Sequence, residues 1–253
     1  MNRISAFAFV FLFGGISARA GEPTADEILK LQDKAHANFK DFTVDATMTI
    51  REPGQKTGRQ FSFTTISRFD EKRLVRFTAP GDIKGMGMLT ESRDVMYAFL
   101  PGFQRVRRLG THVKNQGFMG SDATFEDMAE GQFTGTWKPT LAGSEGDNWI
   151  LDLALVSGHE SEFAKKKIWV DKKMHQITKM EDYDAKGTKV RTQTRGGYVK
   201  DTEDNGGHYA PGVFLIVDHR RNDHSTELVF SNPKANTNVP EDTFSQRSLL
   251  RGQ

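Results

Sequence analysis

Residues 85–128 read GMGMLTESRDVMYAFLPGFQRVRRLGTHVKNQGFMGSDATFEDM and decide the expected fold. In the segment VMYAFL (residues 95–100) both alternating sets of side chains are apolar, which predicts a strand that is buried on both faces. Such a strand needs cover on each side, and in an antiparallel sheet this means a sheet that wraps around something. We therefore expect a curved antiparallel sheet, with a plain two-sheet sandwich as the alternative.

The residues before the first strand predict a helix that fills this sheet. Thr24 and Glu27 have the spacing of a capping box, in which each side chain satisfies a free amide at the helix start. Apolar residues then recur at helical spacing: Ile28, Leu31, Ala35 and Phe39. We expect an amphipathic helix of about four turns that plugs the sheet opposite residues 95–100.

From Phe42 onward the apolar period is two, which is typical of strands. The turns between successive runs are short and polar, so neighbouring strands are expected to be antiparallel. We predict about ten or eleven strands, more than a flat sheet usually holds without curling. Residues 131–148 are interpreted as loop or irregular edge structure, residues near 125–130 as a short helix, and residues 239–244 as a helical turn. The predicted class is mainly β with helices (α+β).

The first twenty residues predict a secretory signal peptide. Arg3 precedes an apolar run over residues 4–16, and Ala18-Arg19-Ala20 is a small-x-small cleavage site. The run is shorter than the roughly 20 residues that a bilayer span needs, although an uncut signal anchor is the alternative. We expect an exported, soluble product, with residues 21–253 forming a single domain.

Composition excludes several classes of protein. The chain has no Cys, which excludes a lipid-modified N-terminal Cys, disulfides and thiolate metal sites. The formal net charge is +2, and Arg3 and Arg19 leave with the signal peptide, so the remaining chain is close to neutral. Because phosphate binding needs a net excess of clustered Lys and Arg, nucleic acid is not an expected partner.

The sequence offers no positive case for catalysis. It has no nucleophile elbow, P-loop or dinucleotide fingerprint. His219 and His224 flank a predicted turn with two Arg residues between them, so a surface turn is favoured over a metal site. We expect no catalytic residues, no metal and no cofactor. A lipid hydrolase would need a nucleophile, for which Ser121 with Asp122 is the candidate.

Binding of an apolar ligand has a better physical argument. Met side chains are flexible and polarizable, so a Met- and Phe-rich surface can repack around ligands of varied shape, although such clusters are often plain core. The candidate residues for an acyl cavity are Phe61, Phe63, Phe77, Met86, Met88, Met96, Phe99, Phe118, Met119 and Phe125. A basic corner at Arg105, Arg107, Arg108 and Lys114 is either a solvated rim or a contact for anionic headgroups or a protein partner.

Several motifs in this order resemble a known family. They are DIKGMG (82–87), MYAFLP (96–101) with RVRR (105–108), and FMGSD (118–122) followed by FEDM (125–128), with weaker matches at IWVD (168–171), YDAKG (183–187) and NVPEDTF (238–244). Together they resemble the LolA-like outer-membrane lipoprotein-sorting family, in a branch associated with RND- or MMPL-type exporters.

The resemblance implies a single unclosed antiparallel β-barrel with an N-terminal helix and a helical lid. It further implies a periplasmic carrier that binds acyl chains of lipoproteins or lipids and shuttles them towards the outer membrane. Its partners would be an inner-membrane transporter of RND/MMPL or ABC type and an outer-membrane acceptor, and the carrier would be a monomer. The alternative is a non-enzymatic adaptor of such a transporter, with a barrel filled by its own side chains and no transported ligand.

Overall fold

The computed structural model describes residues 21–68, 72–92, 95–110, 117–124, 127, 132–200 and 209–251. The predicted signal peptide, residues 1–20, therefore lies outside the described residues. Among these residues the helices are α1 (Ala25–His36) and α3 (Gln246–Arg251), and the 3-10 turns are η1 (Pro101–Phe103), η3 (Phe118–Gly120), η4 (His219–Arg221) and η5 (Glu241–Phe244).

One large antiparallel sheet dominates the fold. Its strands are β1 (Asp41–Arg51), β2 (Arg59–Arg68), β3 (Arg73–Ala79), β4 (Gly87–Ser92), β5 (Val95–Leu100), β6 (Arg105–Arg108), β7 (Trp137–Glu145), β8 (Asn148–Leu155), β9 (Lys165–Asp171), β10 (Ile177–Tyr183), β11 (Lys189–Gly196), β14 (Val213–Asp218) and β15 (His224–Ala235). The short strands β12 (Val199–Lys200) and β13 (Tyr209–Ala210) form a separate ribbon.

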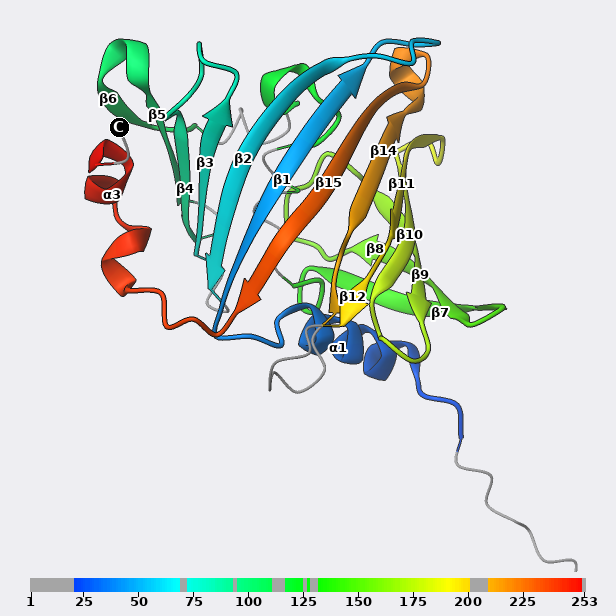
Figure 1. Cartoon of the computed structure of the whole chain (residues 1–253). Coiled ribbons are helices and arrows are strands. Elements are labelled where there is room, and N and C mark those ends of the chain that lie inside the picture. The colour runs from blue at the N-terminus through cyan, green and yellow to red at the C-terminus, as the bar shows by residue number, and fades with distance from the viewer. Residues whose placement is uncertain are drawn as a thin grey trace, which may run out of the picture.

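The thirteen strands lie in the order β6-β5-β4-β3-β2-β1-β15-β14-β11-β10-β9-β8-β7. Strands β6 and β7 are the two edges, so the sheet is not closed into a barrel, and Figure 1 shows it strongly curved. Strands β1 to β6 form one half of the sheet, called the β1–β6 half. Strands β7 to β11, β14 and β15 form the other, called the β7–β15 half, and the pairing of β1 with β15 joins the two. The predicted unclosed antiparallel sheet is confirmed.

Alternation along the strands separates a concave face from an outer face. In β1 the apolar positions Phe42, Val44, Ala46, Met48 and Ile50 are all buried. Most of them join a cluster on the concave face of the β1–β6 half, together with Phe side chains of β2 and β3. On the opposite face of the same half, a second cluster contains Leu74, Leu89 and Phe99.

The C-terminal helix covers that outer face. Leu249 of α3 and Phe244 of η5 pack against the second cluster and are buried. Gly87 permits the close approach, because a Cβ there would lie 2.7 Å from Leu249 Cδ2. Arg76 holds the end of α3, since its Nη2 donates to the carbonyl oxygen of Ser248 at 2.8 Å. The helical turn predicted at residues 239–244 is confirmed by η5.

Helix α1 begins at the predicted capping box but lies elsewhere than expected. The Glu27 amide donates to Thr24 Oγ1 at 3.3 Å, and the Thr24 amide donates to Glu27 Oε2 at 2.7 Å. Ile28 and Leu29 pack into the core of the β7–β15 half, and Figure 1 shows the helix across one end of the sheet. The expectation that it covers residues 95–100 was wrong, because α3 and η5 cover β5 on its outer face.

Two further expectations about the sheet were wrong. The sheet has thirteen strands rather than about ten or eleven, because β6 and β7 extend its edges. Residues 131–148, interpreted as loop or irregular edge, contain β7, whose Pro139 and Gly143 are tolerated because an edge strand pairs on one side only.

No helical lid is seen in the described part of the chain. Within the described ranges no helix lies over the concave face; residues 118–124 form the turn η3 and irregular structure instead. Of the short helix expected near residues 125–130, only Asp127 belongs to the described residues.

We predict that Leu249→Ala lowers the free energy of unfolding by about 2–5 kcal/mol, because it leaves a cavity between α3 and the sheet. Urea unfolding measures this loss. Leu250→Ala is the matched control, because Leu250 is 47% exposed and should change stability by no more than about 0.5 kcal/mol. Equal effects of the two variants would contradict the packing of α3 against β4 and β5.

Candidate functional site

A cavity of about 230 Å³ opens on the concave face. Its walls come from α1, from β1 to β3, and from β11, β14 and β15, with the segment around Phe118 at one end. The aromatic residues that line it are Phe39, Phe42, Phe63, Phe77, Phe118, Phe133, Tyr198, Phe214 and Phe230. The lining is therefore mostly apolar, as a site for a hydrocarbon chain requires.

The structure brings three of the predicted cavity residues to the lining. Phe63, Phe77 and Phe118 line the cavity, with ring centroids 5.2 Å apart for Phe63–Phe77 and 5.3 Å apart for Phe77–Phe118. Phe61, Met86, Met88, Met96 and Met119 belong to the same apolar cluster, behind or beside the lining.

Of the other two predicted residues, only Phe99 is among the described ones. Phe99 lies on the outer face of β5, packed with Leu89 and Leu249. Its position follows from strand parity, because Met96 and Phe99 are three residues apart and so point to opposite faces. Phe125 lies outside the described residues.

Several lining residues were not among the predicted ones. Met48 of β1, Ile216 of β14 and Leu228 of β15 contribute side chains to the wall, as do the rings of Phe214 and Phe230, whose centroids are 5.1 Å apart. The available signal was the period-two alternation in their strands, which marks an inward face. It does not tell which inward-facing residues border a space and which pack tightly.

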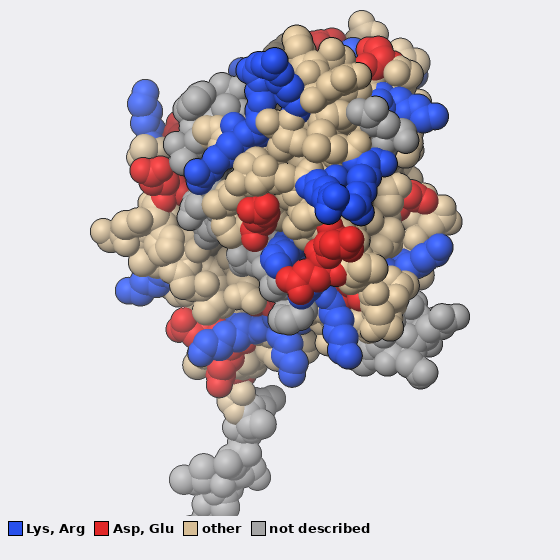
Figure 2. Space-filling model, turned by 90° about the vertical axis from the view of Figure 1, so that its left-hand side faces the viewer, with Lys and Arg blue, Asp and Glu red and all other residues tan. Residues whose placement is uncertain are grey.

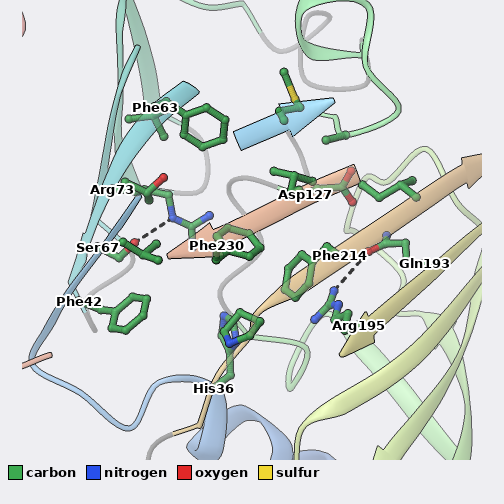
Figure 3. Close-up of a pocket in the computed structure, with 18 of the residues that line it drawn as sticks. His36, Phe42, Phe63, Ser67, Arg73, Asp127, Gln193, Arg195, Phe214 and Phe230 are labelled. Carbon is green, nitrogen blue, oxygen red and sulfur yellow. Dashed lines mark hydrogen bonds between the residues drawn. The ribbon is translucent and has the colours of Figure 1, made fainter. Parts of the chain in front are cut away.

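Polar side chains also reach the cavity from opposite walls, as Figure 3 shows. From β3, Arg73 Nε donates to Ser67 Oγ at 3.2 Å. From β11, Arg195 Nη2 donates to Gln193 Oε1 at 3.4 Å, and its guanidinium lies 4.8 Å from the centre of the Phe214 ring.

A chain of buried charges lies beside the cavity. Lys166 Nζ is 3.0 Å from Asp182 Oδ1, Arg191 Nε is 2.7 Å from Asp182 Oδ2, and two Arg191 nitrogens contact Asp127 at 2.6 and 2.7 Å. Lys166, Asp182 and Arg191 are at most 1% exposed. Trp137 and Phe163 flank Lys166 with ring centres 5.1 and 4.7 Å away.

These contacts set the charge states of the chain. Burial alone would raise the pKa of Asp127 and of Asp182, but the charges of Arg191 and Lys166 outweigh it and hold both pKa values below the ordinary range. Burial would likewise lower the pKa of Arg191, but the two carboxylates raise it. Asp127, Asp182 and Arg191 are therefore charged at neutral pH.

A second buried cluster fastens the segment that follows Phe118. The Asp122 carboxylate accepts hydrogen bonds from Thr226 Oγ1 at 2.7 Å, His224 Nδ1 at 2.8 Å and Arg221 Nη1 at 3.0 Å. Arg191 Nη1 adds a bond to the Asp122 carbonyl oxygen at 3.1 Å. Burial raises the pKa of Asp122, although its partners lower it in part. These bonds connect the segment 118–122, which forms the roof of the cavity, to β11 and β15.

The residues that were considered as a nucleophile or as metal ligands make structural hydrogen bonds in or near this second cluster. Ser121 Oγ donates to the Ala123 carbonyl oxygen at 3.2 Å. His224 contacts Asp122, whereas His219 contacts Asp223 and Thr192, so the two His side chains have separate partners. Over the residues that the structure describes, no group of three His, Cys, Asp or Glu side chains could hold a metal ion.

The predicted basic corner forms the edge strand β6. Arg105, Arg107 and Arg108 are exposed there, and the neighbouring Phe103 is 68% exposed. Lys114 lies outside the described residues. Figure 2 views this side of the molecule and shows Lys and Arg side chains interleaved with Asp and Glu rather than a uniformly basic surface.

Comparisons with known proteins place this chain among proteins of related fold. A family model described as an uncharacterized protein matches residues 69–251. A search of curated protein sequences finds no match.

Three solved structures are similar over almost their whole length. A DUF1329 family protein from Desulfovibrio piger has 22% identity and a TM-score of 0.80, covering 89% of this chain and 99% of its own. A candidate outer membrane lipoprotein-sorting protein domain from Vibrio parahaemolyticus has 23% identity and a TM-score of 0.75, with coverage of 88% and 98%. A LolA superfamily protein from Nitrosomonas europaea has 20% identity and a TM-score of 0.72, with coverage of 89% and 99%.

These likenesses confirm at the level of fold the resemblance to the LolA-like lipoprotein-sorting family. None of the helices in the described part is both long and apolar enough to cross a membrane.

We predict that Arg191→Met lowers the free energy of unfolding by about 3–5 kcal/mol, because it leaves Asp127 and Asp182 buried without their main counter-charge. Denaturant unfolding at neutral pH measures the loss. Arg247→Met is the control, since Arg247 is exposed on α3 and should change stability by less than about 0.5 kcal/mol. A loss below about 1 kcal/mol in Arg191→Met would contradict the role given to the buried charges.

Proposed function

Because the chain belongs to the family whose model matches residues 69–251 and has the fold of LolA superfamily proteins, we propose that it is a periplasmic carrier of acyl chains. It binds the hydrocarbon part of a lipoprotein or lipid on its concave face and shuttles it towards the outer membrane. The single observation that carries this proposal is the apolar cavity bounded by the two halves of the sheet.

The energetics of the cavity suit a carrier. Each methylene removed from water gains about 0.8 kcal/mol, so a chain of about 15 methylenes gains roughly 12 kcal/mol when fully buried. A cavity of about 230 Å³ is smaller than the usual ligand pocket of about 300–1,000 Å³ and covers only part of such a chain. Partial cover lowers the affinity, which favours release of the cargo at an acceptor.

In the carrier the rings of Phe63, Phe77 and Phe118 contact the chain at the deep end of the cavity. The bonds of Asp122 and Asp127 hold Phe118 in place as a roof. The exposed Arg residues of β6 contact an inner-membrane transporter of RND/MMPL or ABC type, or anionic headgroups at a membrane. An outer-membrane acceptor completes the route.

A transporter adaptor without cargo is the second candidate. The observation that favours it is the concave face of the β7–β15 half, which the protein fills with its own side chains: Trp137, Trp149, Leu151, Leu153 and Phe163 among them. The cavity is bordered by β1 to β3 and by β11, β14 and β15, whereas the concave face of β7 to β10 is filled. The two candidates therefore differ in whether this remaining space is occupied by a ligand.

A variant that fills the cavity distinguishes them. We predict that Val75→Phe weakens binding of decanoate at least about tenfold, because the added ring occupies the space that the chain uses. Isothermal titration measures the affinity. Val229→Phe carries the same substitution on the exposed outer face of β15 and should bind as the natural protein does. Equal affinities of the two variants would contradict an acyl chain in this cavity.

The basic edge has its own test. We predict that changing Arg105, Arg107 and Arg108 together to Glu leaves the free energy of unfolding within about 0.5 kcal/mol, because all three are exposed. Transfer of a fluorescent fatty acid from anionic vesicles should slow several-fold at low salt, since surface charges mainly affect association rates.

The control for the basic edge changes the exposed residues Lys138, Lys173 and Lys186 to Glu, which gives the same change in net charge on the other half of the sheet. Equal transfer rates for the two triple variants would exclude a docking role for β6.

A further inference from the structure

We propose that the ligand of the cavity is an amphiphile with an acidic head, a phosphate or a carboxylate, and that Arg195 and Gln193 hold this head. The inference rests on the proposed carrier function and names the class of lipid that this site accepts. It concerns a different part of the cavity from the Phe63, Phe77 and Phe118 rings.

Two hydrogen-bond donors on neighbouring residues of the cavity wall have no acceptor among the described residues. Gln193 is 3% exposed, and its Oε1 accepts from Arg195, which assigns Nε2 as the remaining donor. Within the described part of the chain, neither Gln193 Nε2 nor Arg195 Nε has a hydrogen-bond partner. A buried donor without an acceptor costs free energy, so an oxygen atom of a ligand here would be stabilised by both.

The charges around these donors favour an anion. Arg73 lies on the opposite wall, as Figure 3 shows. The carboxylate that lines the cavity, Asp127, contacts Arg191 through both oxygens, so its charge is already balanced. Arg195 brings a positive charge to the wall, and among the described residues no acidic side chain pairs with it.

The guanidinium of Arg195 is also held in position. It lies 4.8 Å from the centre of the Phe214 ring, a distance at which a cation and an aromatic face attract one another. Arg195 and Gln193 share a hydrogen bond and lie on the same face of β11, so the two side chains meet at one place in the wall. A phosphate or carboxylate offers two or more oxygens and can accept from both.

The arrangement matches the shape of an amphiphile. Arg73 and Arg195 are half-buried, whereas Phe77 and Phe118 are 1% and 4% exposed. A charged head therefore lies at the more accessible end, and the hydrocarbon chain extends towards the buried rings. One further buried atom of the lining, Gln32 Oε1, is an acceptor without a partner among the described residues and suits a hydroxyl group of the head.

A series of ligands with one tail and different heads tests the inference. Titrations with decyl phosphate, decanoate and decyltrimethylammonium, each kept below its micelle concentration, compare heads at constant tail. We expect both anions to bind at least about tenfold more tightly than the cation, because charge-assisted hydrogen bonds are the stronger class. Inorganic phosphate alone should bind far more weakly than decyl phosphate.

Substitutions of Arg195 and Gln193 test whether these two residues cause the preference for anionic amphiphiles. Arg195→Met should reduce the preference for anions to less than about threefold while leaving the affinity for decyltrimethylammonium unchanged or higher. Gln193→Glu, almost the same shape, places a carboxylate beside Arg195 and should abolish the preference in the same way; it decides the matter if Arg195→Met does not fold. Arg247→Met, on the outer helix α3, should keep the full preference.

The outcomes separate this inference from the function on which it rests. Equal affinity of the natural protein for anionic and cationic amphiphiles would overturn the acidic head and leave the carrier standing. An undiminished preference in both the Arg195 and the Gln193 variant would overturn the assignment to these residues. Phosphate binding as tight as that of decyl phosphate would show a site for a free anion. No binding of any amphiphile would overturn the carrier function together with the inference.

Discussion

The pairing of β1 with β15 is the contact on which the rest of the structure depends. These two long strands come from opposite ends of the described chain and pair along most of their length, from Phe42 with Ala235 to Arg51 with Ser225. Through them a meander of strands on one side becomes continuous with a meander on the other. The joined sheet is long enough to curve, and its curvature creates a concave face with two walls. Met48 and Leu228, which face each other across this pairing, both line the cavity.

The two halves of the concave face are filled differently. In the β7–β15 half, large side chains and α1 pack the interior, and the chain from Lys166 to Asp127 is buried beside them. Burying four charges costs desolvation, which close pairing and hydrogen bonds must offset. The four charges alternate in sign, so each pairs with its neighbours. Through Arg191, which contacts both Asp127 and the Asp122 carbonyl oxygen, they connect the loop around Asp122 to strands that are distant in sequence. The rest of the concave face, along β1 to β3, β11, β14 and β15, borders the apolar cavity.

The sequence predicted the elements that depend on local patterns, and it missed those that depend on contacts between residues far apart in the chain. The capping box at Thr24, the alternation in β1 and the turn before Phe244 are local patterns, and each predicted the observed element. Strand β7 was missed because Pro139 and Gly143 usually interrupt strands, and only the position at the sheet edge makes them acceptable. The covering of β5 was assigned to the wrong helix, since a two-faced apolar strand shows that cover exists without showing which element supplies it.

The candidate site was harder to predict for the same reason. Phe63, Phe77 and Phe118 were expected, but Arg191 and Asp127 are 64 positions apart and no local pattern connects them. Arg195 and Gln193 are polar residues on a strand and, in the sequence, resemble any solvated pair. Only the curvature of the sheet turns their side chains towards the cavity.

Native mass spectrometry of protein purified gently from cells tests the central claim most directly, because it asks whether the concave face carries a hydrocarbon ligand in the cell. The account predicts a population with added mass that corresponds to one acyl-chain ligand per monomer, and loss of that population in Val75→Phe. A folded preparation without added mass, whose spectrum is unchanged by Val75→Phe and by added decanoate, would contradict it.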